Sequence, residues 1–195
     1  NEMRIGGDFD KVVRGLELAA RYKFRTVINC VITSKNIAEL EELIDLAERY
    51  GAGILFEPVH EYEEVSKEIW RELGIQNLAE YKSAIDRIIE LKKGGRKILN
   101  SYSYLKMIRD LKPSFNCCID HFLLHVDSTG RVRMCKGIAG SIREKPLREI
   151  WHSEAADRLR GEAKNCRSCL FAGYVEGSLF YRAHLSSIAN YLSQL

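Results

Sequence analysis

Residues 26–59 read TVINCVITSKNIAELEELIDLAERYGAGILFEPV. Two apolar runs, 26–33 and 53–59, stand on either side of a segment whose apolar residues recur at the spacing of one helix face. Neither run alternates with polar residues, which is typical of strands that are covered on both faces in a parallel sheet. A strand, a helix and a strand in this order predict a βαβ unit, so the expected fold class is α/β.

The helix between the two strands has its own start and stop signals. Asn36 and Glu39 have the spacing of a capping box, and Gly51 is where the helix is expected to end. A further helix, capped by Asp8 or Asp10, precedes the first strand. Two such units cannot close a barrel, and two parallel strands alone would leave long unpaired edges. We therefore expect either that the chain is a piece of something larger or that a partner chain covers those edges.

Length and composition limit the class of protein. The chain has 195 residues, of which 46% are hydrophobic, enough for one domain, or a small domain with an appendage, to bury a core. No segment resembles a signal peptide, and no apolar run approaches the about 18 residues of a membrane span. We expect a cytoplasmic protein with no membrane partner. The formal charge of +3 is small and mixed along the helices, so nucleic acid is not expected as a partner.

Cysteines dominate the C-terminal half. Five of the six cysteines lie there, namely Cys117, Cys118, Cys135, Cys166 and Cys169. A hairpin predicted over 122–134, with its turn at Asp127-Ser-Thr-Gly130, delivers Cys135, and Cys166-Arg-Ser-Cys169 is a C-x-x-C turn. Four thiolates at such spacing suit either a zinc ion or a cubane iron–sulfur cluster. In a reducing compartment clustered cysteines more often bind metal than form disulfides. Cys30, in the first strand, is expected to be an ordinary buried side chain.

The remaining segments are predicted to be helical. Residues 63–113 are rich in charge, with helix starts at Asn77 and Ser101, and are interpreted as a bridge. Residues 178–195 are predicted to form one amphipathic helix with four inward residues, Leu179, Leu185, Ile188 and Leu192. The chain is thus expected to have four parts, 1–62, 63–113, 114–177 and 178–195.

These motifs carry a family resemblance. The stretches CCIDHFLLHVDSTGRVRMCKG (117–137) and KPLREIWHSEAADRLR (145–160), together with Cys166-Arg-Ser-Cys169, resemble the twitch or SPASM extension of radical S-adenosylmethionine enzymes. The stretches GGDFDKVVRGLELA (6–19) and TVINCVITSKNIAELEELIDLAERYGA (26–52) look like the second half of the same family's partial β/α barrel. The resemblance implies that half of a barrel is followed by a helical bridge and a small domain, built of a hairpin and helices, that binds a cluster.

The resemblance also implies cofactors and their ligands. It implies one auxiliary 4Fe-4S cluster, for electron transfer or for positioning a substrate, with ligands among the five clustered cysteines. One of Cys117 and Cys118 would be spare, and Cys117 fits the family position slightly better. Asn29 and Pro58 occupy positions that approach S-adenosylmethionine in the family's barrel, whereas Glu57 is interpreted as a solvated loop end. The reaction would be the oxidation or modification of a small molecule or a peptide.

Two departures from the family pattern limit this expectation. The C-x3-C-x2-C motif that holds the radical-generating cluster is absent, so this chain alone is not expected to be competent, and the missing N-terminal barrel half would have to supply that cluster. No cysteine follows Cys169, which favours one auxiliary cluster, the twitch arrangement. No catalytic residue is predicted. Two alternatives stay open at this point: a non-catalytic interaction module that binds zinc through four cysteines, and a fragment without physiological activity.

Overall fold

The computed structural model of this chain describes residues 6–61, 66–164, 166–183 and 185–192. The chain divides into two compact units, Asn1–Asp110 and Leu111–Ser193. The described elements of the first unit are α1 (Phe9–Arg21), β1 (Val27–Ile32), the 3-10 turn η1 (Ile37–Glu39), α2 (Leu40–Arg49), β2 (Gly53–Pro58), α3 (Lys67–Leu73), α4 (Leu78–Lys93) and α5 (Tyr102–Arg109).

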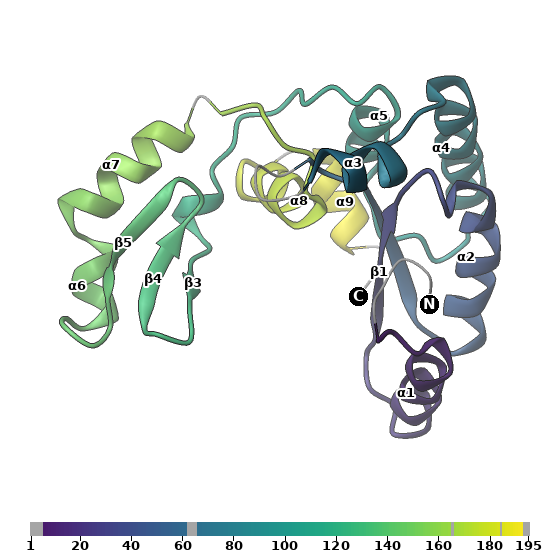
Figure 1. Cartoon of the computed structure of the whole chain (residues 1–195), viewed down its shortest axis with the longest axis horizontal. Coiled ribbons are helices and arrows are strands. Elements are labelled where there is room, and N and C mark those ends of the chain that lie inside the picture. The colour runs from purple at the N-terminus through teal and green to yellow at the C-terminus, as the bar shows by residue number, and fades with distance from the viewer. Residues whose placement is uncertain (1–5, 62–65, 165, 184, 193–195) are drawn as a thin grey trace. The chain divides into compact units, whose positions relative to one another are not determined.

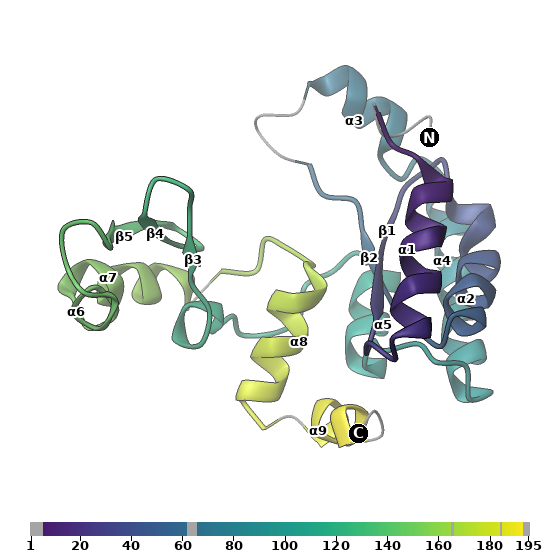
Figure 2. The same cartoon turned by 90° about the horizontal axis from the view of Figure 1, so that it is seen from below.

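The predicted βαβ unit is present, and the α/β class is confirmed. β1 and β2 pair in parallel, with Val27 opposite Gly53 and Ile32 opposite Pro58. α2 connects them, and α2 and α4 lie along the same side of the two strands (Figures 1 and 2). Asp8 caps α1 by accepting a hydrogen bond from the Lys11 backbone N–H, as one of the two predicted caps should. That the two strands belong to a barrel stays a prediction.

The prediction that both faces of the first strand are covered is wrong for the described chain. Cys30 and Ile32 are buried, but Val27 and Val31 are 48% and 42% exposed. Because side chains alternate along a strand, one face of β1 packs under the helices while the other lies open. The residue types of β1 did not indicate this, since both faces carry β-branched residues.

The capping box predicted at Asn36 is also wrong. Its side chain makes no capping hydrogen bond to the helix. Instead, the Asn36 Oδ1 atom accepts from the Thr33 backbone N–H at 2.8 Å, and Nδ2 donates to the Val31 carbonyl at 2.9 Å. Asparagine competes well for nearby backbone groups, so here it stabilises the end of β1. α2 begins only at Leu40, after the 3-10 turn.

The segment after α4 extends the sheet beyond β2. Ile98 forms a parallel bridge to Ile54. Asn100, only 1% exposed, binds both backbone groups of Phe56: Oδ1 accepts from the N–H at 2.8 Å, and Nδ2 donates to the carbonyl at 3.1 Å. One buried side chain thus replaces a neighbouring strand at this position.

The two helices predicted within 63–113 are present, with Asn77 and Ser101 as their N-caps. α4 and α5 pack together, and the buried Tyr81 hydroxyl donates to the Ile108 carbonyl at 2.9 Å. Both helices lie within the first compact unit, which ends at Asp110. The segment interpreted as a bridge therefore contributes α3, α4 and α5 to that unit, and its residues 63–65 lie outside the described ranges.

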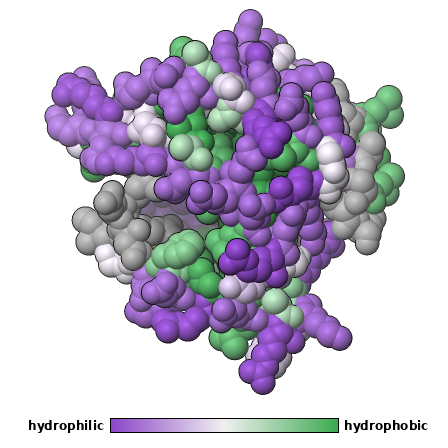
Figure 3. Space-filling view, turned by 90° about the vertical axis from the view of Figure 1, so that its right-hand side faces the viewer, coloured by the Kyte–Doolittle hydropathy of each residue, from purple (hydrophilic) through white to green (hydrophobic). Residues whose placement is uncertain are grey.

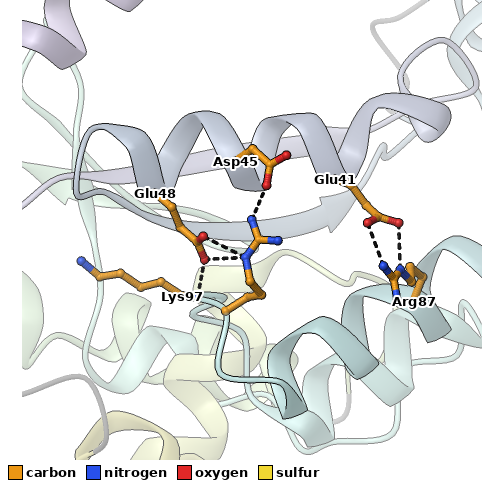
Figure 4. Close-up of polar contacts among 6 residues, drawn as sticks. Glu41, Asp45, Glu48, Arg87 and Lys97 are labelled. Atoms are coloured by element: carbon orange, nitrogen blue, oxygen red, sulfur yellow. Dashed lines mark hydrogen bonds and ion pairs between the residues drawn. The ribbon is translucent and has the colours of Figure 1, made fainter.

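Charged side chains join the outer surface of α2 to α4 and to the turn that follows it. The Arg96 Nε atom lies 2.8 Å from both carboxylate oxygens of Glu48, and its guanidinium also contacts Asp45. Arg87 and Glu41 form a second, two-pronged pair at 2.8 and 3.1 Å (Figure 4). Figure 3 shows that hydrophilic side chains cover most of the side of the molecule that carries these helices. Because the pairs are largely solvated, each adds only modestly to stability.

The described elements of the second unit are η2 (Ile119–His121), β3 (His125–Val126), β4 (Arg131–Met134), β5 (Gly137–Ser141), α6 (Leu147–Trp151), α7 (Glu154–Ala163), α8 (Ala172–Tyr181) and α9 (Leu185–Leu192). The three strands form an antiparallel sheet in the order β3-β4-β5, with α6 and α7 on one side of it (Figures 1 and 2). Met134 packs there against Ala156 and Leu159 of α7. The predicted hairpin is confirmed, although β3 is shorter than expected. The third strand, β5, was not predicted.

The turn of the hairpin is fixed by a single side chain. Asp127 Oδ1 accepts from the Thr129 N–H at 2.8 Å, the Thr129 hydroxyl at 2.6 Å and the Arg131 N–H at 3.1 Å. Gly130 has a φ of +84°, which favours glycine. The Asp-x-x-Gly pattern thus provides the side chain and the backbone conformation that this turn requires. The turn also sets the register of β4, which ends just before Cys135.

The single helix predicted over 178–195 is wrong. The described residues form two helices, α8 and α9, and Ala183 between them has a φ of +55°. Leu179 is buried as expected, but Leu185 and Leu192 are 83% and 61% exposed. Residues 184 and 193–195 of that prediction lie outside the described ranges. Within those ranges, no helix combines the length and the apolar character that crossing a membrane requires.

Candidate metal centre

Cys117 and Cys118 lie just before η2, and both are buried at 4% exposure. Their sulfurs make opposite kinds of hydrogen bond. The Cys118 Sγ atom donates to the Ser178 carbonyl of α8 at 3.7 Å. The Cys117 sulfur accepts from the Ile119 N–H and the Ser178 hydroxyl. Burial raises the pKa of Cys117 overall, and these two hydrogen bonds act in the opposite direction. The two neighbouring cysteines thus contact Ser178 in different ways.

Cys135 follows β4, and Asp120 holds its backbone. The Cys135 N–H donates to the Asp120 Oδ1 atom at 2.8 Å. Asp120 is 1% exposed, and its Oδ2 atom has no hydrogen-bond partner among the described residues. Burial raises the pKa of this carboxyl group, while the Cys135 N–H, Arg160, His121 and Lys136 act in the opposite direction. A buried carboxylate oxygen without a partner is costly, so its place beside a cysteine calls for an explanation.

Arg160 ties this region to the helices of the second unit. Its Nε atom donates to the Asp120 carbonyl at 3.1 Å, and an Nη atom donates to the Trp151 carbonyl at 2.7 Å. The guanidinium carbon lies 4.4 Å from the centroid of the Trp151 ring. The side chain of Arg160 is only 12% exposed, so these contacts are shielded from solvent. Arg160 thus joins α6 and α7 to η2, and through Asp120 to Cys135.

Cys166 and Cys169 follow α7. The Cys166 Sγ atom lies 3.0 Å from the Ser168 hydroxyl oxygen, and the Lys136 ammonium donates a hydrogen bond to the same sulfur. Burial alone would raise the pKa of Cys166, but Ser168 and Lys136 lower it overall. The pKa of Cys169 is raised, chiefly by burial.

Electrostatic effects show that four of the cysteines lie near one another. The pKa of Cys135 is raised to about 11, first by burial of its sulfur, then by Asp120, and also by Cys117 and Cys169. Cys166 in turn raises the pKa of Cys117. Side chains influence one another in this way only at short range, so Cys117, Cys135, Cys166 and Cys169 share one neighbourhood. Cys118 is not among the groups that raise these values.

The quartet is gathered, but it is not tight. Among the side chains that the structure describes, no three metal-binding groups lie close enough to hold one metal ion. Around a zinc ion, with Zn–S distances of about 2.3 Å, tetrahedral sulfurs stand about 3.8 Å apart. A cubane separates its thiolates further, because each binds a different iron. The donor type, four cysteine sulfurs, suits either a zinc ion or an iron–sulfur cluster.

The residues predicted to approach S-adenosylmethionine lie in the first unit. Asn29, on the open face of β1, donates from Nδ2 to the Glu57 Oε1 atom at 2.9 Å. Pro58 is buried and ends β2. Ligands of parallel α/β sheets bind at this carboxyl end of the strands, but the cofactor contacts of Asn29 and Pro58 stay predictions. The interpretation of Glu57 as a solvated loop end is wrong, since this residue lies within β2 and is 9% exposed.

Cys30 is buried at 7% exposure, and its pKa is raised to about 12, first by burial and then by Glu57. We expect it to stay unmodified when the folded chain is treated with iodoacetamide at pH 8. At that pH, well below the raised pKa, Cys30 is a neutral thiol, and the thiolate is the reactive form. Peptide mass spectrometry measures this, with the partly exposed Cys166, whose pKa is lowered, and the urea-unfolded chain as positive controls. Rapid labelling of Cys30 in the folded chain would contradict the packing around β1.

Residues 117–170 match the model of the SPASM family, described as an iron–sulfur cluster-binding domain. The second unit carries a SPASM domain. All five clustered cysteines fall within the matched residues. The sequence-based assignment of this region to a domain of that type is therefore confirmed.

Comparisons that extend over most of the chain agree with this match. An AdoMet-dependent heme synthase of Methanosarcina barkeri is 28% identical over 179 residues, covering 79% of this chain and 50% of that protein. Native anSMEcpe with bound AdoMet has a similar fold, with a TM-score of 0.57 at 16% identity, over 95% of this chain and 60% of that one. The structure of anSMEcpe with AdoMet and Cp18Cys peptide gives a TM-score of 0.53 at 17% identity, over 95% of this chain and 61% of that one. The chain is thus similar in sequence to the heme synthase and in fold to anSMEcpe, and it spans about half the length of the curated relative that it matches.

Proposed function

We propose that this chain is the C-terminal portion of a radical S-adenosylmethionine enzyme and that its SPASM domain holds one auxiliary 4Fe-4S cluster. The cluster would serve electron transfer or substrate positioning during the oxidation or modification of a small molecule or a peptide. The observation that carries this proposal is the SPASM match over residues 117–170, which contains a quartet of neighbouring cysteines. The description of the matched family as an iron–sulfur cluster-binding domain supports a cluster over the alternative of a zinc site.

Four residues are proposed as ligands: Cys117, Cys135, Cys166 and Cys169. Each of them raises the pKa of another member of this set, or has its own pKa raised by one. Cys118 is proposed as the spare cysteine, because its sulfur donates to the Ser178 carbonyl. A cysteine bound to a metal has lost its thiol proton and could not make this contact. The contact supports Cys117 as the ligand of the pair.

The protein's own part is to fix the donors and surround them with polar groups. When bound, the cluster supplies a site that accepts or gives one electron. Asp120 and Arg160 hold the backbone of Cys135 in place relative to η2. Ser168 and Lys136 hydrogen-bond to the Cys166 sulfur. Four ligands would leave no iron open to substrate, which favours electron transfer over direct substrate binding.

Several features support a further barrel half outside these 195 residues. The chain contains no C-x3-C-x2-C motif, and it spans half of the heme synthase that it matches. Val27 and Val31 leave two large apolar side chains exposed on the open face of β1, where a larger α/β structure would cover them. Asn29, between them on the same face, and Pro58, at the carboxyl end of β2, would then contact S-adenosylmethionine. The names of the relatives, one a heme synthase and one solved with a peptide, leave both substrate classes in the proposal.

The proposal is tested by reconstituting the whole chain with iron and sulfide under anaerobic conditions. We expect about four iron and four sulfide per chain, with broad absorbance near ~400 nm that decreases on reduction. Zinc is measured in the same sample before reconstitution. A colourless chain with one tightly bound zinc would contradict the proposal and favour the interaction module. Activity needs a separate test, in which an upstream barrel half is added and S-adenosylmethionine cleavage is measured.

A further inference from the structure

Two side chains of opposite charge border the cysteine quartet. Asp120 contacts Cys135 through the backbone, and its negative charge raises the pKa of both Cys135 and Cys117. Lys136 is the next residue after Cys135, yet its ammonium reaches Cys166. Asp120 thus contacts Cys135 directly, and Lys136 follows Cys135 in the chain, so both charges belong to the immediate surroundings of the quartet.

The carboxyl group of Asp120 is more than a backbone support. Its Oδ1 atom is occupied by the Cys135 N–H at 2.8 Å, but Oδ2 is buried without a hydrogen-bond partner among the described residues. Holding the backbone requires only one acceptor, which an asparagine would supply equally well. The fold therefore does not need the negative charge of Asp120. Because this charge is buried, solvent screens its interactions only weakly.

Lys136 is likewise not needed to fold the sheet. Its residue surface is exposed, and the strand pairing around it is made by backbone groups of Met134 and Gly137. The ammonium nevertheless turns toward Cys166, where Ser168 already provides a hydroxyl at 3.0 Å. A lysine that hydrogen-bonds to a sulfur stabilises negative charge there.

We propose that Asp120 and Lys136 set the reduction potential of the auxiliary cluster in opposite directions. This inference rests on the proposed function. Reduction adds one electron to the cluster, with no bond made or broken, so a nearby negative charge opposes it and a nearby positive charge favours it. Charge, hydrogen bonds to the sulfurs and burial are the means by which proteins tune such potentials.

The test is a dithionite redox titration of the reconstituted whole chain, followed by electron paramagnetic resonance. Asp120→Asn keeps the acceptor for Cys135 and removes the charge, so the midpoint potential should rise. Lys136→Met removes the ammonium and should lower it, whereas Lys136→Arg should stay near the unmodified chain. We expect a change of about tenfold in the reduction equilibrium for each charge removed, about 59 mV for one electron.

Matched controls come from Glu144 and Lys145, adjacent exposed residues before α6. Glu144→Gln and Lys145→Met remove the same charges, and we expect much smaller shifts because solvent screens exposed charges. Thermal unfolding and iron content are measured on every variant. Shifts of the two test variants in the same direction, or no larger than those of the controls, would overturn the inference.

Two further outcomes separate this inference from the function beneath it. If Asp120→Asn loses its iron while Lys136→Met keeps it, Asp120 acts by holding Cys135, and its share of the proposal is wrong. If the unmodified chain takes up no iron and sulfide, the proposed function fails and the inference fails with it. If the chain takes up the cluster but its variants titrate at the same potential as the unmodified chain, the inference is wrong and the proposed function is unaffected.

Discussion

Replacing Cys117 by serine should remove most of the iron and sulfide from the reconstituted chain, whereas the same replacement of Cys118 should leave the content nearly unchanged. The two residues are adjacent, equally buried and chemically identical, so the pair is its own control. Only the sulfur of Cys117 accepts hydrogen bonds and interacts with Cys166. The sulfur of Cys118 instead donates a hydrogen bond to the Ser178 carbonyl oxygen, at 3.7 Å.

The measurement is iron and sulfide per chain, with the absorbance near ~400 nm as a second readout. Cys30→Ser, in the other compact unit, controls for the loss of any cysteine. Far-ultraviolet circular dichroism checks that each variant is folded. Equal losses in the Cys117 and Cys118 variants would mean that either sulfur can reach the cluster. Loss in the Cys118 variant alone would reverse the ligand assignment.

Replacing Asn100 by alanine should lower the free energy of unfolding of the first unit by about 2–4 kcal/mol. The side chain is 1% exposed and satisfies both the N–H and the carbonyl of Phe56. Alanine would leave both groups buried and unpaired, and this usually costs more than the hydrogen bonds themselves contribute. Urea unfolding followed by circular dichroism measures the change.

Asn77→Ala serves as the comparison, because Asn77 is an exposed helix cap that accepts from Ala79 and Glu80. A lost cap costs about 1 kcal/mol. The Asn100 variant should therefore be clearly less stable than the Asn77 variant. If both unfold at the same urea concentration, water or a rearranged backbone replaces the contacts of Asn100, and the sheet edge is more tolerant than its burial indicates.

Local patterns predicted the local structure well. The βαβ unit follows from hydrophobic runs and a helical stripe within residues 26–59, because each pattern needs only its own neighbours to be recognised. The hairpin turn follows from Asp127 and Gly130 for the same reason: the aspartate accepts three nearby hydrogen bonds, and the glycine adopts a positive φ. Asn77 and Ser101 also cap their helices as predicted.

The failures involve groups that are distant in the sequence. The open face of β1 depends on which elements cover it, and the strand's own residues do not encode that. Asn36 could cap the helix or stabilise the end of the strand. In the structure it contacts Thr33 and Val31 and so stabilises the strand end. The break near Ala183 has no glycine or proline to announce it.

The candidate site shows the same limit. Spacing singled out the five clustered cysteines, because hairpin ends and C-x-x-C turns are local features. It left Cys117 and Cys118 open, since Ser178, whose contacts differ between the two, lies 60 positions from Cys118. Asp120 and Lys136 were missed altogether. The only available signal was their place within three residues of a predicted ligand, and many surface charges share that property.

Ser178 gives the C-terminal helices a part in how the centre is assembled. Its hydroxyl donates to the Cys117 sulfur and accepts from the Cys118 N–H at 3.1 Å, and its carbonyl receives the Cys118 thiol. The cysteine pair therefore acquires its final orientation only once α8 has folded against it. A chain cut before α8 would lack the contacts that orient Cys117 and Cys118, so we expect it to take up less iron and sulfide on reconstitution than the 195-residue chain.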